Sequence, residues 1–282
     1  MKVKLSKHRG FCFGVSRGVS LAEKTLSSHK NTNVYSIGPL IHNPQVVKQL
    51  AKKGLKVIDN LKGIKKGIVI ISCHGTSPLV LENIRKNRLK LVDATCPFVK
   101  RPQLIARSLE ESGYLVIIVG DKKHSEVKSL LSFAKNRAIV VSSEEEANRL
   151  KIKNKKIGII AQTTQSEEIF NKIVSIILKN KGFEVRIFNT ICDDAAKRQE
   201  KARRLAKQVD VMLVIGGKAS ANTKRLAMVC KNACSNVYHI ETSHQLKPKW
   251  CKYKSSVGIT SGASTPDWVV DEVVKKIKKE GE

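Results

Sequence analysis

The residues Leu89-Lys-Leu-Val-Asp-Ala-Thr-Cys-Pro97 decide the fold. Their apolar run predicts a short β-strand, Cys96 stands at its end, and Pro97 suits the first turn of a helix, where the missing N–H costs nothing. The same order of strand, cysteine and helix recurs at two other places in the chain. The cysteines of this repeat are Cys12, Cys96 and Cys192, which lie 84 and 96 residues apart. The spacing predicts one α/β unit built three times.

Each repeat contains two more strand-like runs that end in a small polar turn. The first runs end at Gly38, Gly120 and Gly216. The second are found in the segments 68–75, 157–164 and 257–264. Continuous apolar strands that alternate with helices are typical of parallel sheets covered on both faces, and ligands collect at the carboxyl ends of such strands. We therefore expect three α/β units with mostly parallel sheets in a pseudo-threefold arrangement that points the three cysteines at one centre.

The expected domains are 14–96, 97–192 and 193–282, with 1–13 joining the third. Hydrophobic residues make up 41% of the 282 residues, which is enough for a core and excludes a disordered basic tail protein. No apolar run approaches the roughly 18 residues of a membrane span, and the N-terminus has no apolar signal segment. We expect a cytoplasmic protein whose seven cysteines are thiols or metal ligands rather than disulfides.

The formal net charge is +29, from 53 Lys and Arg against 24 Asp and Glu. The charge is compatible with a solvated basic surface or with an anionic partner, such as nucleic acid, an acidic electron-carrier protein or a phosphorylated substrate. Aromatic residues are only 5%, and no stretch interleaves them with bases as a single-strand binder would. Charge alone does not decide between these partners.

Three matched cysteines are one short of the four thiolates that usually hold a [4Fe–4S] cluster. With three, one iron keeps an open position and can act as a Lewis acid. The alternative is three buried structural cysteines. The chain has no Cys-x-x-Cys pair, so a zinc ribbon is not indicated. We expect Cys73 and Cys251 to fill the core, while the spacing of Cys230 and Cys234 would also allow a metal chelate.

The loops after the strands are rich in hydrogen-bond donors, namely His42, His74, His124, Thr163, Ser220, Asn222 and Ser264. Histidine, hydroxyl and amide donors at helix N-termini suit a phosphate or diphosphate. Glu126 is the only carboxylate in these loops, and beside an anionic ligand it would carry a proton. A structural histidine and a solvated loop glutamate are the alternatives for single members of this set.

Six short strings are spread in order along nearly the whole chain, from residue 10 to residue 267. They are Gly10-Phe-Cys-Phe-Gly-Val15, Gly38-Pro-Leu-Ile-His-Asn-Pro-Gln45, Cys73-His-Gly75, Asp93-Ala-Thr-Cys-Pro97, Asn189-Thr-Ile-Cys192 and Gly262-Ala-Ser-Thr-Pro-Asp267. Together they resemble the 4-hydroxy-3-methylbut-2-enyl diphosphate reductase family. This resemblance implies three α/β domains in a clover-like arrangement around a central iron–sulfur cluster.

The resemblance also implies roles for individual residues. One [4Fe–4S] cluster per chain would be held by Cys12, Cys96 and Cys192. Substrate would contact His42, His74, His124, Thr163, Ser220, Ala221, Asn222 and Ser264. Glu126 would deliver a proton to the departing hydroxyl, with Thr163 and His124 beside it. The implied reaction is the reductive dehydroxylation of 4-hydroxy-3-methylbut-2-enyl diphosphate to isopentenyl and dimethylallyl diphosphate in the non-mevalonate isoprenoid pathway. The implied electron donor is a ferredoxin or flavodoxin.

Two departures from the family pattern affect the expected site. The family commonly has two adjacent serines where this chain has Ser220-Ala221, so one hydroxyl donor is absent. A charge-assisted hydrogen bond of this kind contributes roughly 1.5–3 kcal/mol. The family commonly has His-Pro-Glu where this chain has His124-Ser125-Glu126, and serine lacks the fixed φ of proline. Both departures bear on affinity and rate more than on reaction type.

Two other functions compete with this interpretation. A different three-cysteine iron–sulfur enzyme, one resembling quinolinate synthase, would leave the three histidines and Glu126 without a role. A basic nucleic-acid-binding protein would bind with a steep salt dependence, but it gives no reason for three matched cysteines. We therefore do not expect nucleic acid or a membrane as the partner.

Overall fold

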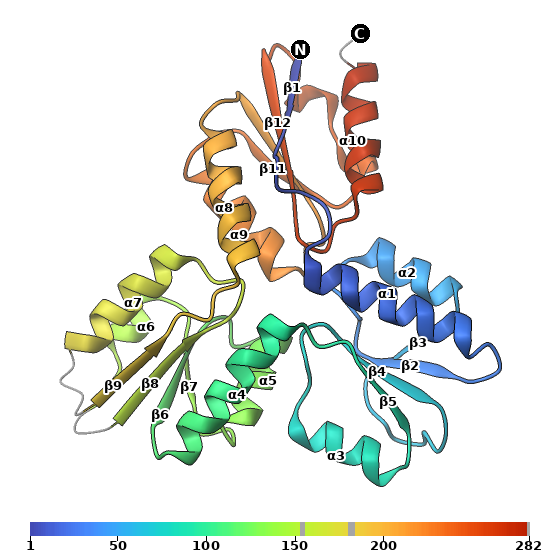
Figure 1. Cartoon of the computed structure of the whole chain (residues 1–282). Coiled ribbons are helices and arrows are strands. Elements are labelled where there is room, and N and C mark those ends of the chain that lie inside the picture. The colour runs from blue at the N-terminus through green and yellow to red at the C-terminus, as the bar shows by residue number, and fades with distance from the viewer. Residues whose placement is uncertain (153–155, 180–183, 281–282) are drawn as a thin grey trace. The chain divides into compact units, whose positions relative to one another are not determined.

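The computed structural model describes residues 1–152, 156–179 and 184–280. Strands and helices alternate along the chain, as the repeat predicts (Figure 1). The strands in the described residues are β1 (Lys2–Leu5), β2 (Val34–Ile37), β3 (Leu55–Ile58), β4 (Ile68–Ile71), β5 (Lys90–Asp93), β6 (Leu115–Val119), β7 (Ile139–Val141), β8 (Lys156–Ala161), β9 (Glu184–Phe188), β10 (Val211–Ile215), β11 (Val237–Ile240) and β12 (Ser256–Ser261).

The helices follow the strands and begin where the sequence supplies caps or proline. Ser77, His124, Ser143 and Ser220 each accept a backbone N–H of the first turn of the helix that follows. The helices are α1 (Phe13–Ser28), α2 (Pro44–Lys52), α3 (Pro78–Lys86), α4 (Pro97–Glu111), α5 (Ser125–Phe133), α6 (Glu144–Asn148), α7 (Glu167–Lys179), α8 (Asp193–Ala206), α9 (Ala221–Lys231) and α10 (Asp267–Glu280), with the 3₁₀ turns η1 (Ser243–Gln245) and η2 (Pro248–Trp250). None of these helices in the described part of the chain is long and apolar enough to cross a membrane.

The strands form three four-stranded sheets, in the orders β3-β2-β4-β5, β7-β6-β8-β9 and β11-β10-β12-β1. Every recorded strand pairing is parallel. The prediction of three similar α/β units with parallel sheets is confirmed. The third sheet takes its outer strand β1 from the start of the chain.

The same topology recurs in each sheet. The chain leaves the first inner strand, forms an outer strand on one side and then returns to form the second inner strand on the other side. The strand order therefore reverses between β2 and β4, between β6 and β8, and between β10 and β12. In open parallel sheets, ligands bind at the carboxyl ends of the strands at such a reversal. The expected site residues follow these inner strands, and the three cysteines follow the remaining outer strands β5, β9 and β1.

The chain forms two compact units. Unit 1 comprises Met1–Ser16, Ile41–Lys48 and Asp193–Glu282 and contains the sheet β11-β10-β12-β1. Unit 2 comprises Arg17–Leu40 and Gln49–Cys192 and contains the other two sheets. The domain boundaries at 96 and 192 stay a prediction.

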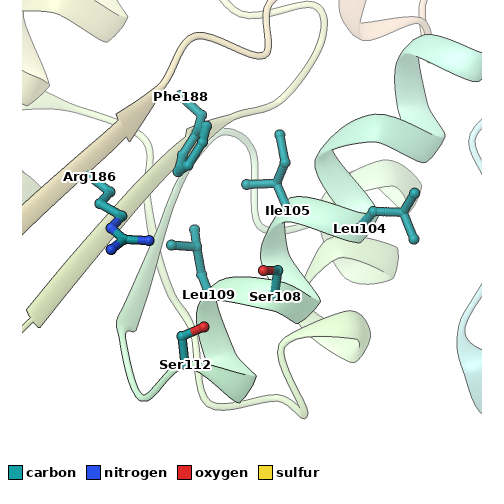
Figure 2. A pocket seen from close by; sticks show the side chains of 7 residues that line it. All are labelled: Leu104, Ile105, Ser108, Leu109, Ser112, Arg186 and Phe188. Atoms are coloured by element: carbon teal, nitrogen blue, oxygen red, sulfur yellow. The ribbon is translucent and has the colours of Figure 1, made fainter.

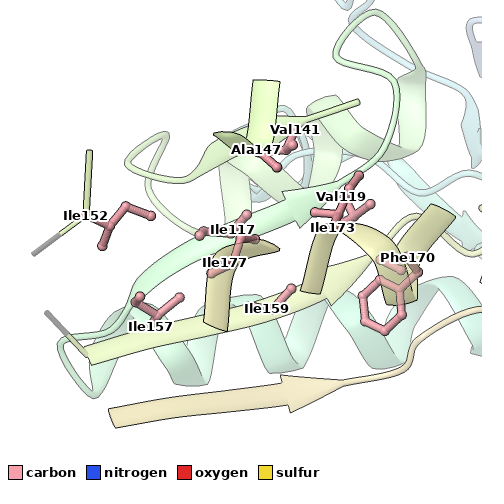
Figure 3. Close-up of a cluster of buried hydrophobic side chains, with 11 residues drawn as sticks. Ile117, Val119, Val141, Ala147, Ile152, Ile157, Ile159, Phe170, Ile173 and Ile177 are labelled. Carbon is pink, nitrogen blue, oxygen red and sulfur yellow. The ribbon is translucent and has the colours of Figure 1, made fainter. Parts of the chain in front are cut away.

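The core of the β6–β9 sheet shows how the apolar strands are used. Figure 3 shows Ile117, Val119, Ile157 and Ile159 from the strands packed with side chains of the helix α7, such as Ile173. The helices α4 and α5 cover the opposite face through a second cluster that includes Leu109 and Val127. Both faces of this sheet are therefore buried, which explains why its inner strands are continuously apolar.

We predict that Ile117→Ala lowers the free energy of unfolding by about 2–5 kcal/mol, because the side chain is fully buried and its removal leaves a cavity. Chemical denaturation measures the change. Leu178→Ala on α7 is the matched control, because Leu178 is 50% exposed and its truncation should cost less than about 0.5 kcal/mol. Equal losses for the two variants would contradict this account of the core.

Candidate functional site

The three repeat cysteines have equivalent backbone contacts. The Cys96 amide donates to the carbonyl of Cys73 at 3.1 Å, the Cys12 amide to that of Ala263 at 3.0 Å, and the Cys192 amide to that of Thr163 at 2.8 Å. Each acceptor is the second residue after an inner strand, namely β4, β12 or β8. The equivalence that the spacing predicted is therefore present in the local structure of every sheet.

Each cysteine also stands directly before a helix, α1, α4 or α8, and each is partly exposed. The positive end of a helix favours a negative charge, as a metal-binding thiolate requires. The Val15 amide lies 3.4 Å from the Cys12 sulfur and donates to it. Cys96 occupies the N-cap position of α4, and its side chain does not cap the helix.

Cys96 and Cys192 belong to unit 2, whereas Cys12 belongs to unit 1. Within the described ranges, no three His, Cys, Asp or Glu side chains are grouped so that they could hold a metal ion. The convergence of the three cysteines on one centre therefore stays a prediction. The local geometry supports each ligand separately.

Glu126 and Thr163 form the most closely built part of the site in unit 2. The Thr163 amide donates to Glu126 Oε1 at 2.7 Å, and the Thr163 hydroxyl donates to Oε2 at 2.8 Å. Glu126 is only 2% exposed. Burial raises the pKa of Glu126 to about 7, although both bonds from Thr163 lower it. The carboxyl can therefore hold and release a proton near neutral pH.

Two histidines are linked to Glu126 in unit 2, His124 through the backbone amide of Glu126 and His74 through the ring of His124. His124 is the N-cap of α5, and its Nδ1 accepts the amide of Glu126 at 3.2 Å. A ring nitrogen that accepts carries no proton, so Nε2 carries the ring proton of the neutral form and can donate to a ligand. The rings of His124 and His74 meet edge to face with centroids 5.7 Å apart. The structure thus brings together four predicted residues, His74, His124, Glu126 and Thr163.

A second group of predicted residues lies in unit 1. The Ser264 hydroxyl donates to the backbone carbonyl of His42 at 3.3 Å. Gly217 also approaches this carbonyl, because a Cβ built there would lie 2.4 Å from the same oxygen. Only glycine allows the chain after β10 to pass this close. Burial and the charge of Lys224 lower the pKa of His42.

Asn222 provides an observation that points to a ligand. It is 6% exposed, and neither its side-chain oxygen nor its side-chain nitrogen has a hydrogen-bond partner within the described structure. A buried amide without partners is costly unless a ligand or a water satisfies it. Ser220, the N-cap of α9, is 5% exposed and lies two residues before Asn222. This arrangement fits a polar or anionic group bound at the start of α9.

The two departures from the family pattern lie at helix starts. Ala221 is the first residue of α9 and is partly buried, so it offers only its backbone to a ligand. Ser125 is the first residue of α5, where proline is also common. The helix begins there without proline because His124 caps it.

Two positioning features were not identified from the sequence. Arg198 is 1% exposed and donates to the Ser261 carbonyl at 3.1 Å and to Asp194 at 3.3 Å, while Asp194 contacts His8 at 2.8 Å. This network holds the loop that leads to Cys12. The sequence does not indicate this burial, because an arginine four residues after an aspartate is typical of an ion pair on the exposed side of a helix.

Asn43 is the second of these features. It caps α2 by accepting the amide of Val46, and its buried amide nitrogen has no partner within the described residues.

The other cysteines behave as core residues. Burial and the neighbouring Cys234 raise the pKa of Cys230 to about 12, so it is a neutral thiol. Cys251 packs against the core of the third sheet. Cys73 is buried, and a Cβ at Gly18 would lie 2.3 Å from its sulfur. Glycine at position 18 thus makes room for Cys73.

Comparison with known proteins places this geometry in one family. The family model described as LytB protein matches residues 3–278. The chain is 48% identical to the proteins named 4-hydroxy-3-methylbut-2-enyl diphosphate reductase of Geotalea uraniireducens and of Geobacter metallireducens, in each case over 99% of this chain and 98% of the relative.

Two solved structures of diphosphate reductases are also similar, one described as (E)-4-hydroxy-3-methyl-but-2-enyl diphosphate reductase and the other as E-1-hydroxy-2-methyl-but-2-enyl-4-diphosphate reductase. One, described as the terminal enzyme of the non-mevalonate pathway, is 42% identical with a TM-score of 0.69 and covers 99% of this chain and 100% of its own. The other, from Plasmodium falciparum, is 28% identical with a TM-score of 0.92 and covers 97% of this chain and 87% of its own. Sequence and fold therefore agree over nearly the full length.

The raised pKa of Glu126 predicts a pH-dependent stability difference. The folded state holds the Glu126 proton up to about pH 7, whereas an unfolded glutamate loses it near the ordinary pKa of 4.5. Between these values, rising pH should lower the free energy of unfolding of the wild type relative to Glu126→Gln, by up to about 3 kcal/mol. Denaturation of both apoproteins at pH 5 and pH 8 measures the difference. A difference that stays constant or moves in the opposite direction would show that the carboxyl is ionised in the folded protein.

Proposed function

Because this chain belongs to the LytB protein family, we propose that it is a 4-hydroxy-3-methylbut-2-enyl diphosphate reductase of the non-mevalonate isoprenoid pathway. The observation that carries the proposal is the buried Glu126 carboxyl, which has a pKa of about 7 and is held by Thr163. His124 accepts the backbone amide of Glu126, and the His124 ring contacts that of His74. A proton donor beside donors suited to an anion is what the removal of a hydroxyl from a diphosphate ester requires.

We propose that the cofactor is one [4Fe–4S] cluster with Cys12, Cys96 and Cys192 as ligands. The chemistry of the donors supports this set, because each thiol lies at the start of a helix. The backbone amide of each cysteine also donates a hydrogen bond to a carbonyl just after an inner strand. When bound, a cluster with three protein thiolates supplies electrons one at a time and offers one iron that can act as a Lewis acid.

The diphosphate would be bound by His42, Ser220, Asn222 and Ser264, together with His74 and His124. The unpartnered amide of Asn222 and the helix start at Ser220 support this assignment for unit 1. Backbone N–H groups at a helix start bind phosphate without a full positive charge. Ala221 would contribute its backbone only, so this chain would bind the diphosphate with one hydroxyl fewer than the family pattern.

The proposed reaction consumes two electrons and two protons. The C–O bond to the terminal hydroxyl breaks, water leaves, and a new C–H bond forms at one of the two ends of the allyl group. Glu126 would give one proton to the departing hydroxyl oxygen. Both donors of Thr163 are directed at the carboxyl, so the acid proton would occupy a position on the carboxyl that Thr163 does not use. Thr163 thereby orients the acid, and the burial of Glu126 keeps it protonated up to about pH 7.

The electrons must come from outside the proposed site. The sequence has no Gly-x-Gly-x-x-Gly dinucleotide motif, so a bound nicotinamide cofactor is not indicated. A ferredoxin or flavodoxin is the proposed donor, and the cytoplasm is the proposed location. The net charge of +29 is complementary to such acidic carriers.

We predict that Glu126→Gln keeps the cluster and the substrate affinity but lowers turnover at least about 100-fold, because a glutamine amide cannot supply the proton. Wild-type turnover should fall as the pH rises above about 7, where Glu126 loses its proton. Steady-state kinetics with a small-molecule reductant measures both effects. Glu167→Gln, an exposed change on α7, is the control. Near-normal turnover in Glu126→Gln would remove Glu126 from the acid role.

The cofactor proposal is tested by iron and acid-labile sulfide analysis of anaerobically purified protein. We expect about four of each per chain, a large loss in Cys96→Ser and wild-type content in Cys230→Ser. Cys230 is a suitable control because it is a buried core thiol. Little iron in the wild type after anaerobic reconstitution would contradict the cluster, and equal iron in both variants would contradict Cys96 as a ligand.

A further inference from the structure

We propose that one face of the β6–β9 sheet and its helix α4 is the docking surface for an acidic one-electron carrier protein. This α4–β9 face consists of Phe98, Arg101, Leu104, Ile105, Arg186 and Phe188, all within unit 2. The proposal rests on the proposed function, because only a reductase that draws electrons from outside needs such a surface. It states where on this chain the electron carrier would bind.

The helix α4 exposes large apolar side chains and an arginine on one side. Phe98, Arg101 and Leu104 are three residues apart, and Ile105 is four residues after Arg101, which puts all four along one side of the helix. Phe98 is 46% exposed and Leu104 is 60% exposed, and Arg101 is exposed as well. The opposite side of α4 is buried against its sheet, and Ile105 packs partly against the same core cluster. Phe98 and Leu104 do not belong to that cluster and remain exposed.

An open cavity lies between α4 and the outer strand β9. Figure 2 shows Ile105 and Leu109 on the helix facing Arg186 and Phe188 on the strand, while Leu104, at the rim of the cavity, points away from the strand. The cavity has a volume of about 300 Å³ and is lined by both apolar and polar atoms. Apolar pockets beside an arginine are typical of the places where protein partners anchor.

The charge on this face suits an acidic partner. The Arg186 guanidinium stacks on the Tyr114 ring at 4.8 Å and bonds Glu184 at 3.1 Å, and these contacts fix its position. Glu184 also lies 3.6 Å from Lys156, so its carboxylate is neutralised locally. A preorganised arginine loses little freedom when it binds a carboxylate of a partner.

Both elements of the face are connected to expected cluster ligands. The helix α4 begins at Pro97, directly after Cys96, so Phe98 lies in the first turn beside this cysteine. The strand β9 ends at Phe188, four residues before Cys192. At a rise of about 1.5 Å per residue, Leu104 stands roughly 10 Å along α4 from Pro97. A carrier docked on this face would therefore sit close to two of the three ligands.

The test uses the holoprotein and a reduced, acidic plant-type [2Fe–2S] ferredoxin as the probe. The variant is Arg101→Glu combined with Leu104→Asp, neither of which belongs to the proposed site. The matched control is Arg203→Glu on α8 combined with Leu178→Asp on α7, which makes the same charge change at exposed positions elsewhere. Ferredoxin affinity is measured at low and high salt, on the holoprotein and the apoprotein. Reduction of the holoprotein by ferredoxin is compared with reduction by dithionite.

We expect the variant to bind ferredoxin at least tenfold more weakly at low salt and to be reduced by it correspondingly more slowly. Reduction by dithionite should change less than twofold, and the control should match the wild type.

Equal ferredoxin binding by variant and control would overturn the proposal, as would an equal loss of reduction by ferredoxin and by dithionite. A dimer of the wild type in sedimentation that the variant abolishes would assign the face to a second copy and also overturn it. If ferredoxin binds the face but the wild type holds no cluster, the proposed function fails while the docking surface stands.

Discussion

One backbone hydrogen bond, from a cysteine amide to the carbonyl two residues beyond an inner strand, recurs in all three sheets. It ties the loop after an outer strand to the turn at which the strand order reverses. The sulfur atoms and the donors after the inner strands are thus fixed by the backbone of their own sheet. Parallel pairing makes this possible, since it brings the carboxyl ends of neighbouring strands to the same edge.

The same turns determine the electrostatics of the site. Thr163 accepts the Cys192 amide through its carbonyl and donates its own amide and hydroxyl to Glu126. A single residue therefore links an expected cluster ligand to the expected acid. Burial outweighs the two hydrogen bonds and keeps the carboxyl neutral up to about pH 7, where an exposed glutamate would be ionised. In unit 1 the equivalent turn carries Ser264, which is tied to His42 instead.

Much of this arrangement could be predicted from sequence, because the signals were local and repeated. The apolar runs and the spacing of Cys12, Cys96 and Cys192 predict three parallel sheets, and the structure confirms them. The burial of Glu126 could not be predicted, because it results from packing in the folded chain. Its hydrogen-bond partner Thr163 lies 37 residues further along the chain. Arg198 was missed for a similar reason, since its partner Ser261 comes from another strand end. The unpartnered Asn222 amide is a property of packing alone.

The central claim is that three thiolates from three sheets hold one cluster and leave one iron without a protein thiolate. Mössbauer spectroscopy of holoprotein reconstituted with isotopically enriched iron tests this most directly. The account predicts that about one quarter of the iron has a spectrum distinct from that of the three irons bound by protein thiolates, and that added substrate changes mainly this quarter. Iron that is all equivalent, or a substrate effect shared by every iron, would contradict it.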